Sequence, residues 1–510
     1  MCGIAAYVGK NPAERIATIN NVARKLRHRG PDTAGLHATE DAVVAHQRLS
    51  IVDVKSGKQP LFSEDGKVAL VCNGEIYNHE ALRKRLAQNH CFKTRSDSEV
   101  IIHLYEEMGS ECVNELAGMF AFVLTDGENV LAARDPFGIK PLYMGHDKGG
   151  ALWFASEIKG LSDLSDDVME FPAGVVFTEK KGFQKWFRPS WVEPPEFPRP
   201  PNGEMIVGQL RSAVTRRLMS DVPVGVFLSG GLDSSIVAAL VRPQMDRLKS
   251  FSVGLENSGD LLAARVVAEY LETEHHELIY TKEDMVRVLK TVIYHLESYD
   301  PALIRSAIPC YFVSKLASDY VKVVLSGEGS DEAFAGYSYF RDMSNPIALH
   351  RESVRILETL HNINLQRVDR MTMAHSLEAR VPFLDTEFLA MAMTIDPEIK
   401  LHGSERAEKW ILRKAFDGLL PNEILWRTKE EFANGCGSES VLEEYCDSYI
   451  EDDKFEERKS LFPIDTPTTK EAFNYRCIFD EFFPGDALLE TVGRWKGTTG
   501  RLDEIRVSND

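Results

Sequence analysis

The sequence has few of the features that mark membrane or secreted proteins. No apolar run approaches the roughly 20 residues needed to span a bilayer, and the N-terminus lacks the basic region and long apolar core of a signal peptide. The eight cysteines are scattered, with no CxxC pair and no histidine at zinc-site spacing, which argues against a disulfide framework or a structural zinc. We therefore expect a cytoplasmic protein that does not bind membranes.

Positive charge is also scarce. The chain has 59 lysines and arginines against 78 aspartates and glutamates, a net charge of -19. Such a surface repels phosphate backbones, so nucleic acid is not an expected partner. Low-complexity tracts are absent, and 44% hydrophobic residues is ordinary for a globular protein, so disorder is expected only at the ends.

The length and one proline-rich seam predict two domains. A chain of 510 residues exceeds what one hydrophobic core usually organises. Six prolines fall between Pro189 and Pro201, a density that resists both helix and central strand. We predict a first domain over 2–188, a linker over 189–203, a second domain over 204–495 and a frayed tail over 496–510.

The two domains differ in their hydrophobic patterns. Upstream, short β-rich runs alternate with turn residues at 42–52, 67–74, 121–126, 129–135 and 151–156, and helices are expected near 12–27 and 79–89. This predicts a layered α+β domain. Downstream, strands at 224–229, 249–255 and 321–326 each precede a glycine-bearing loop and a helical stretch, which predicts an α/β doubly wound parallel sheet with added helices from about 340 onward.

Cys2 is the first candidate nucleophile. A small residue at position two normally permits removal of the initiator methionine, and Cys2 would then carry a free α-amino group. That amine has a pKa of about 7.7–8.0 and lies beside a thiol of pKa about 8.5, so it can serve as the general base for the thiol. In isolation, however, Cys2 reads equally as the start of an apolar strand.

Other residues support the nucleophile reading, because an enzyme that hydrolyses glutamine must hold both ends of the amino acid and stabilise an oxyanion. Arg48 can pair with the α-carboxylate, and Asp97 can take the α-ammonium. Asn73 and Gly74 can offer a side-chain amide and a backbone N–H to the oxyanion. The alternative for Asn73-Gly74 is a hairpin turn, since Asn-Gly between apolar runs is the strongest short hairpin signal.

The first domain resembles the class II glutamine amidotransferases, which have an N-terminal cysteine nucleophile. The resemblance is carried by RHRGPD (27–32), HQRLSIVD (46–53), NGEIYN (73–78), SDSEVI (96–101), LAGMFAF (116–122), RDPFGIKPLY (134–143) and FASEIK (154–159). It implies that Cys2 is the nucleophile, that Asn73 and Gly74 are catalytic, and that glutamine is held by Arg48, Leu49, Ser50, Ile51, Val52, Asn73, Gly74, Glu75 and Asp97.

The second domain contains a candidate nucleotide site. VPVGVFLSGGLDSSIVAAL reads as a strand, a glycine-rich loop and a helix whose first amides form an anion site. No lysine follows the glycines, which argues against the usual phosphate loop of γ-phosphoryl transfer. Asp233 and Asp331 follow two strands on the same sheet edge and are the candidate Mg²⁺ ligands. A glycine turn that merely packs helix against strand is the alternative for the loop, and helix-end charge is preferred for Glu332.

SGGLDSS resembles the pyrophosphate loop of ATP pyrophosphatases, and residues 205–435 resemble the asparagine synthetase domain. The resemblance implies catalytic roles for Glu328 and Lys429, with Mg²⁺ accompanying ATP. It places Arg305, Glu378 and Arg380 near the acceptor substrate, whereas Ala302 and Leu303 depart from the threonines of well-known members. Implied contacts to ATP are made by Leu228, Ser229, Gly230, Gly231, Asp233, Ser234, Ser235, Val253, Ser326 and Gly327.

The two resemblances together imply one reaction. Ammonia released from L-glutamine at Cys2 would pass internally to a carboxylate adenylated by ATP, with L-aspartate as the expected acceptor and a homodimer as the family's expected assembly. Two alternatives stay open. One is a related ligase that amidates a different carboxylate, which the altered positions 302 and 303 leave possible; the other is a non-catalytic, nutrient-responsive scaffold.

Overall fold

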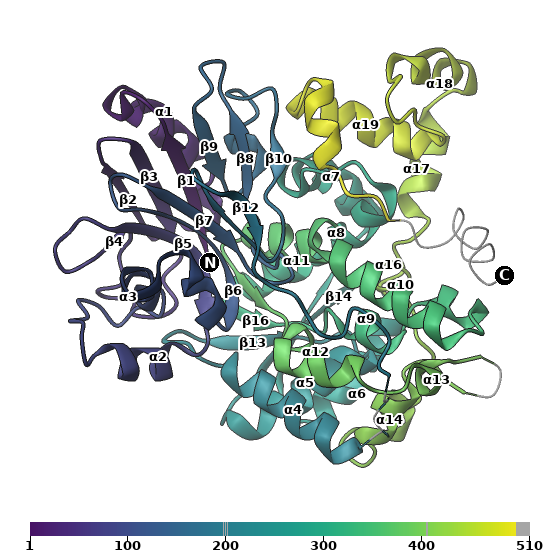
Figure 1. Cartoon of the computed structure of the whole chain (residues 1–510). Helices are drawn as coiled ribbons and strands as arrows, with labels where there is room; N and C mark the ends of the chain where they lie inside the picture. The colour runs from purple at the N-terminus through teal and green to yellow at the C-terminus, as the bar shows by residue number, and fades with distance from the viewer. Residues whose placement is uncertain (197, 199, 201, 404–405, 496–510) are drawn as a thin grey trace.

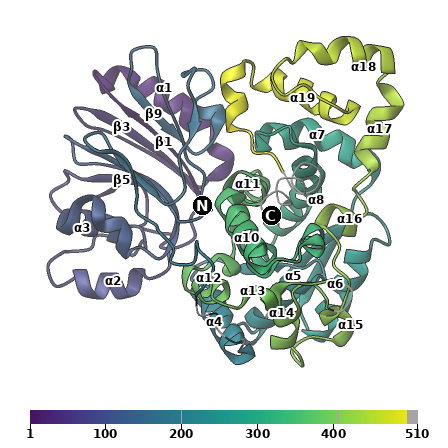
Figure 2. The same ribbon diagram turned by 45° about the vertical axis from the view of Figure 1, so that its right-hand side comes forward.

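The structure is a computed structural model that describes residues 1–196, 198, 200, 202–403 and 406–495. The N-terminal and C-terminal parts of the chain form two domains that lie side by side, and the N-terminus lies between them in both views (Figures 1 and 2). Among the described residues, no helix is long and apolar enough to cross a membrane. The predicted tail, 496–510, lies outside the described residues, as do linker positions 197, 199 and 201.

The first domain contains two antiparallel sheets of six strands each. One has the order β10-β8-β9-β1-β3-β2, formed by β1 (Cys2–Val8), β2 (Thr33–Ala38), β3 (Ala42–Arg48), β8 (Tyr143–His146), β9 (Leu152–Ala155) and β10 (Met169–Glu170). The other has the order β12-β11-β7-β6-β5-β4, formed by β4 (Leu61–Phe62), β5 (Ala69–Ile76), β6 (Gly118–Thr125), β7 (Val130–Arg134), β11 (Val175–Thr178) and β12 (Gly182–Lys185).

Side-chain alternation explains how these sheets stack. In β1, Ile4 and Ala6 pack with Val71 of the opposite sheet, while Ala5 and Tyr7 point the other way and join the cluster that contains α1 (Pro12–Lys25). On the outer face of the second sheet, α2 (His79–Leu86) and α3 (Glu99–Met108) contribute to a separate cluster. The resulting order of helix, sheet, sheet and helix confirms the layered α+β prediction; α3 was not predicted as a helix.

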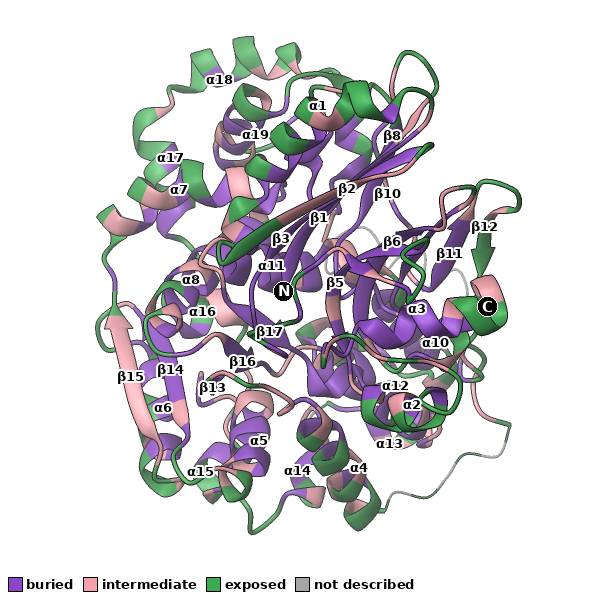
Figure 3. Cartoon of the chain, turned by 90° about the vertical axis from the view of Figure 1, so that its left-hand side faces the viewer, coloured by how far each residue is buried: buried purple, intermediate pink, exposed green. Residues whose placement is uncertain are grey.

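The second domain is built on a five-stranded parallel sheet with the order β15-β14-β13-β16-β17, which confirms the α/β prediction. Its strands are β13 (Val224–Phe227), β14 (Lys249–Gly254), β15 (Glu274–Ile279), β16 (Val323–Leu325) and β17 (Glu378–Arg380). The sequence did not predict the two edge strands, because β15 is polar and half-buried (Figure 3) and β17 has only three residues, two of them charged.

Helices account for most of the remaining second domain. They are α4 (Gly203–Arg216), α5 (Leu232–Val241), α6 (Gly259–Tyr270), α7 (Lys282–Leu296), α8 (Pro301–Ser318), α9 (Ser330–Phe334), α10 (Pro346–Thr359), α11 (Asn364–Met373), α12 (Thr386–Met393), α13 (Pro397–Lys400), α14 (Trp410–Ala415), α15 (Asn422–Leu425), α16 (Phe432–Gly435), α17 (Val441–Tyr449), α18 (Asp452–Arg458) and α19 (Lys470–Phe482). The helical region expected after residue 340 is therefore present.

A buried arginine joins the two domains. Arg29, which ends the short 3-10 helix Arg27–Arg29, donates from Nε to the carbonyl oxygen of Cys2 over 2.9 Å. Its Nη1 lies 2.7 Å from a carboxylate oxygen of Glu157 in the same domain and 2.8 Å from one of Asp369 on α11. Because a buried charge is costly without partners, this guanidinium holds the start of β1 against α11.

A second set of buried charges continues the interface. Glu297, at the end of α7, accepts hydrogen bonds from the backbone amides of Ile158 over 2.9 Å and Lys159 over 2.7 Å. Its carboxylate also lies 2.9 Å from Nη2 of Arg370, whose Nη1 lies 3.1 Å from Glu157. Each charged group in this set lies against an opposite charge, so a buried ionic network joins the domains.

Removing one carboxylate from this network should be strongly destabilising. We expect Asp369→Ala to lower the free energy of unfolding by about 3–5 kcal/mol, because Arg29 would stay buried with half of its anionic partners gone. Denaturant titration measures the change. The matched control is Asp163→Ala, which breaks the solvent-exposed pair with Lys25 and should have an effect several times smaller. Equal, small effects of the two substitutions would contradict the claim that Asp369 stabilises the interface between the domains.

Candidate active sites

Cys2 lies at the start of the central strand β1, directly opposite Arg48 of β3. Its side chain is buried, and its backbone N–H donates to Oδ1 of Asn73 over 2.9 Å. Burial raises the pKa of the Cys2 thiol, although the positive charge of the Met1 α-ammonium group acts to lower that pKa. The strand reading and the nucleophile reading of Cys2 are therefore compatible in this fold.

Asn73 and Gly74 lie within β5 and not in a hairpin turn, so the turn alternative is wrong. They pair with Ala121 and Phe120 of β6. A Cβ added to Gly74 would lie 2.0 Å from the carbonyl oxygen of Met119, so only glycine fits there. Asn73 is fully buried, and its Nδ2 has no hydrogen-bond partner within the described part of the chain. This leaves a preorganised donor beside Cys2, as an oxyanion site requires.

The predicted glutamine-holding residues surround the same strand ends. Nη2 of Arg48 donates to the carbonyl oxygens of Val52 and Asp53 over 2.9 and 2.8 Å, which folds the 49–53 loop back over the end of β3. The carboxylate of Asp97 accepts from the Ile76 amide over 2.6 Å. Burial raises the pKa of Asp97 despite that hydrogen bond. The structure thus brings Cys2, Arg48, the 49–52 loop, Asn73 and Asp97 to one region.

The loop that follows β3 also contacts the second domain. The Asp53 amide donates to the carboxylate of Asp221 over 2.8 Å, and the Asp221 amide donates to the carbonyl oxygen of Ile51 over 3.0 Å. Asp221 follows α4 and precedes β13, the strand that leads into the predicted phosphate loop. The 49–53 loop, which contains predicted glutamine-holding residues, is therefore held by hydrogen bonds to the second domain.

Glu378 and Arg380 lie beneath the N-terminus. The Glu378 carboxylate accepts a hydrogen bond from the α-ammonium group of Met1 over 3.0 Å, and Nε of Arg380 lies 2.6 Å from the same carboxylate. Glu75 lies 3.8 Å from Arg380. Burial and the nearby Glu378 carboxylate raise the pKa of Glu75 well above its usual range. Glu378 and Arg380 are not among the described residues lining the nucleotide cavity, because β17 is the sheet edge nearest the first domain.

The second domain contains a cavity at the carboxyl ends of its parallel strands. It brings together most of the predicted nucleotide residues with both predicted catalytic residues: Leu228, Ser229, Gly231, Asp233, Ser234, Val253, Ser326, Gly327, Glu328 and Lys429. Gly230 and Ser235 lie behind this lining. Gly230 has φ +70°, and a Cβ there would lie 2.4 Å from backbone atoms of Ala263 and Ala264 on α6. The glycine is therefore required both for the loop's conformation and for its approach to α6.

Sequence reasoning missed Lys409, which lies between the two candidate metal ligands. Its Nζ is 2.6 Å from a carboxylate oxygen of Asp233 and 2.6 Å from one of Asp331, and it is buried. Burial disfavours the ionised form of Asp331, yet the ammonium groups of Lys409 and Lys429 outweigh that effect and hold its pKa well below the usual range. Two converging carboxylates that already face a cation fit a Mg²⁺ site, with the lysine ammonium standing in for part of the metal's charge.

Two arginines are placed differently from expectation. Arg305 pairs with Glu443 and Glu471 of the C-terminal helical region and is not among the described cavity residues, so the structure does not bring it to the predicted acceptor site. Arg367 on α11 instead lines the cavity and forms an ion pair with Glu328. Arg367 was not predicted from the sequence, because its partner Glu328 lies 39 residues away in the chain.

Comparison with known proteins covers both domains. Residues 1–196 match the family model described as glutamine amidotransferase domain, and residues 206–348 and 342–498 match the one described as asparagine synthase. Glutamine-hydrolyzing asparagine synthetase 2 of Arabidopsis thaliana is 46% identical over 517 residues, covering 96% of this chain and 89% of that protein. A probable glutamine-hydrolyzing asparagine synthetase of Dictyostelium discoideum is 43% identical over 545 residues, covering 98% and 97%.

The phosphate loop gives a matched pair of glycine substitutions. Gly230→Ala should lower the free energy of unfolding by about 1–3 kcal/mol, because the methyl group meets the α6 backbone and the positive φ is unfavourable. Gly231→Ala should be nearly neutral, since Gly231 has φ −73° and an added Cβ would meet only Ser229 Oγ at 3.2 Å. Denaturant titration of the two variants compares them. Equal stability would mean that this loop can shift away from α6.

Proposed function

This chain belongs to the family of glutamine-hydrolysing asparagine synthetases, and on that premise we propose that it makes asparagine from L-aspartate, L-glutamine and ATP. The observation that carries the proposal is the presence of both predicted sites, one in each domain, in a single chain. One holds Cys2 beside the unpartnered amide nitrogen of Asn73. The other gathers most of the SGGLDSS loop, with Glu328 and Lys429, around one cavity.

In the first half reaction, the Cys2 thiolate attacks the amide carbon of glutamine. Asn73 Nδ2 and the Gly74 amide receive the developing oxyanion, and the C–N bond breaks to release ammonia. Water then cleaves the thioester to glutamate. The base in this scheme is the Cys2 α-amine, which requires loss of Met1. Met1 is only 1% exposed and is paired with Glu378, so we infer that it is removed before this segment becomes buried.

In the second half reaction, a β-carboxylate oxygen of aspartate attacks the α-phosphorus of ATP and pyrophosphate leaves. Gly231, the N-cap of α5, and Ser234, in the first turn of that helix, line the cavity, so the phosphates would bind at the helix N-terminus. Asp233 and Asp331 would hold Mg²⁺, which neutralises phosphate charge when bound. Lys409 and Lys429 add positive charge on the same side. Ammonia then attacks the β-carbonyl carbon and AMP leaves.

Ammonia must travel between the two sites, and β17 suggests the direction. Glu378 at one end of this strand contacts Met1, the residue directly before Cys2 in the chain. The strand itself pairs with β16, whose end leads into the cavity residues Ser326 to Glu328. An internal route would protect ammonia from protonation in bulk water. We propose that the route passes the buried cluster of Glu75, Glu378 and Arg380, in which Arg380 lies 2.6 Å from Glu378 and 3.8 Å from Glu75.

The residues at the predicted acceptor site also support a second candidate for the acceptor carboxylate. Ala302 and Leu303 line the cavity, and Arg305, one turn farther along α8, is committed to Glu471 and Glu443. A ligase acting on a different carboxylate is thus the alternative. A cytoplasmic location, homodimer formation and the absence of nucleic-acid and membrane binding also remain proposals, supported by composition and by family resemblance.

The reaction can be tested with a panel of carboxylates. Incubated with glutamine, ATP, Mg²⁺ and the panel, the protein is expected to form asparagine, glutamate, AMP and pyrophosphate, as identified by mass spectrometry. Cys2→Ala should abolish the use of glutamine but keep synthesis from ammonia, because only the first site loses its nucleophile.

Two outcomes would contradict this scheme. Formation of ADP in place of AMP would exclude adenylation, and amidation of another acid without asparagine would exclude aspartate as the acceptor. Loss of both activities in Cys2→Ala, with the variant folded by circular dichroism, would assign Cys2 a structural role. A fully inactive parent protein would favour the scaffold alternative.

A further inference from the structure

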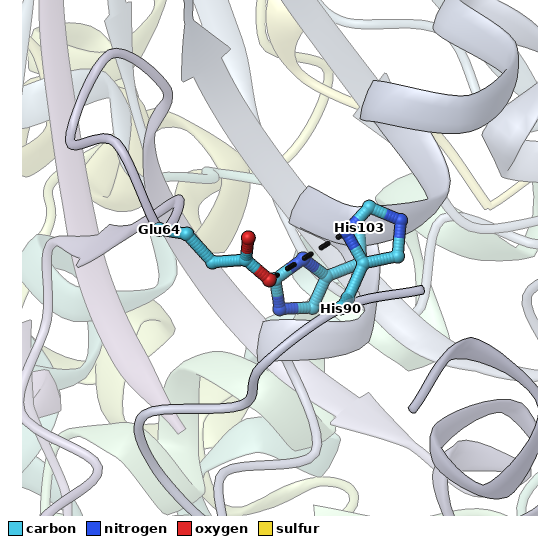
Figure 4. Close-up of side chains that lie close together, drawn as sticks. All are labelled: Glu64, His90 and His103. Atoms are coloured by element: carbon cyan, nitrogen blue, oxygen red, sulfur yellow. Dashed lines mark ion pairs between the residues drawn. The ribbon is translucent and has the colours of Figure 1, made fainter. Parts of the chain in front are cut away.

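A cluster of histidine and glutamate side chains lies in the first domain, outside the two sites described above. Glu64 comes from the turn between β4 and β5, His90 from the segment between α2 and α3, and His103 and Glu106 from α3. Glu64, His90 and His103 each offer one ligand atom, and these atoms all lie within 4.8 Å of one another. Figure 4 shows the three side chains turned toward each other from their separate elements.

The spacing of Glu64, His90 and His103 fits a single metal ion, and Glu106 lies close to both histidines. Oε2 of Glu106 lies 2.9 Å from Nδ1 of His103 and 3.5 Å from Nδ1 of His90. Nδ1 of His90 lies 3.8 Å from Oε1 of Glu64. Ligand atoms about 2.0–2.1 Å from a tetrahedral Zn²⁺ are about 3.4 Å from one another. The observed separations bracket that value, so Glu64, His90 and His103 can share one ion, and a side-chain movement of Glu106, which already lies beside both histidines, would supply the fourth ligand.

The backbone around the cluster holds the ligands in place. The Cys91 amide donates to the Glu64 carboxylate, and Nζ of Lys93 donates to the carbonyl oxygens of Ser63 over 2.6 Å and Glu64 over 3.2 Å. On the other side of His103, a carboxylate oxygen of Glu99 lies 3.9 Å from Nε2. Nε2 is buried and has no hydrogen-bond partner among the described residues. One ring nitrogen of His103 therefore forms no hydrogen bond within the described part of the chain, and Glu99 is an acid that lies near it.

We propose that Glu64, His90, His103 and Glu106 form a binding site for a divalent transition-metal ion of the Zn²⁺ or Co²⁺ type. Imidazole nitrogen with carboxylate oxygen suits these ions, whereas Mg²⁺ and Ca²⁺ prefer oxygen alone. The two carboxylates balance the charge of the ion. The two histidines come from different elements, so the metal joins the 87–98 segment to α3.

The position of the site gives it a consequence for glutamine binding. The segment that carries His90 continues through Thr94 to Asp97. The backbone amide of Thr94 donates a hydrogen bond to the Glu99 carboxylate over 2.8 Å. Asp97 is the residue assigned to the α-ammonium of glutamine, so this consequence rests on the proposed function. A bound ion should restrict opening of residues 88–97 and thereby stabilise the glutamine pocket; the metal site itself does not depend on that assignment.

Cobalt titration of untagged protein tests the site directly. We expect one equivalent of Co²⁺ to give the visible absorption of a tetrahedral nitrogen and oxygen site, and Zn²⁺ to displace it. His90→Ala should weaken binding at least tenfold, because it removes one of four ligands. The matched control is His146→Ala: His146 is a solvent-exposed histidine that also pairs with a carboxylate, Asp167, over 2.8 Å, and its removal should leave binding unchanged.

Three results would overturn the proposal. Absence of saturable binding would mean that the cluster is only a set of ion pairs. Equal binding by the two alanine variants would place the ion elsewhere, and a thiolate charge-transfer band would place it at a cysteine.

Hydrogen exchange gives a second readout that does not depend on activity. At a Zn²⁺ concentration of about 100 times Kd, exchange of residues 88–97 should slow by about a hundredfold if opening releases the ion. The effect should vanish in His90→Ala and persist in His146→Ala. Unchanged exchange despite confirmed cobalt binding would overturn the link to Asp97. An inactive enzyme with normal metal binding would instead count against the proposed function alone.

Discussion

The buried guanidinium of Arg29 is the interaction on which the arrangement of the two sites depends. It binds the backbone carbonyl of the nucleophile Cys2 and, at the same time, the Asp369 carboxylate on α11. Two residues earlier on that helix, Arg367 reaches the nucleotide cavity and pairs with Glu328. One helix thus contacts the segment that carries the predicted nucleophile through Asp369 and Arg29, and lines the predicted nucleotide cavity through Arg367, so the two predicted sites share one structural element.

The interface between the domains buries many charged side chains. Glu157, Glu297 and Arg370 are almost inaccessible to solvent, and each lies against an opposite charge. In a medium of low effective dielectric such pairs are strongly directional, and leaving any one partner unmatched is unfavourable. The ionic interface therefore specifies one orientation of the domains more sharply than an apolar interface of the same size would.

The sequence was most informative where local pattern and chemistry coincide. The thiol at Cys2, the predicted glutamine-holding residues Arg48, Asn73 and Asp97, and the glycine-rich loop were all singled out because each motif has a chemical rationale. The structure places Cys2 beside Arg48 and Asn73 and most of the loop at one cavity, while their roles stay predictions. The Asn73-Gly74 pair shows the limit of such signatures, since its usual turn meaning is overridden by the neighbouring strand β6. Arg305 shows the opposite limit, because its partner Glu471 lies more than a hundred residues away in sequence.

Residues that act through long-range contacts could not be found from the sequence. Lys409 lies in a left-handed backbone conformation directly before α14, in a segment whose pattern predicted only a helix, yet its ammonium group pairs with both Asp233 and Asp331. Strand β17 is too short and too charged to be predicted, and its role follows only from its position beside the N-terminus. In both cases tertiary packing, which local propensity does not encode, decides the structure.

The central claim is that nitrogen passes inside the protein from Cys2 to the nucleotide cavity. The most direct measurement supplies glutamine labelled with ¹⁵N in its amide together with an excess of unlabelled ammonia, and follows the isotope content of newly formed asparagine by mass spectrometry. The account predicts that asparagine made during glutamine turnover keeps the label with little dilution. Asparagine whose label falls to the isotope ratio of the solvent ammonia would contradict it.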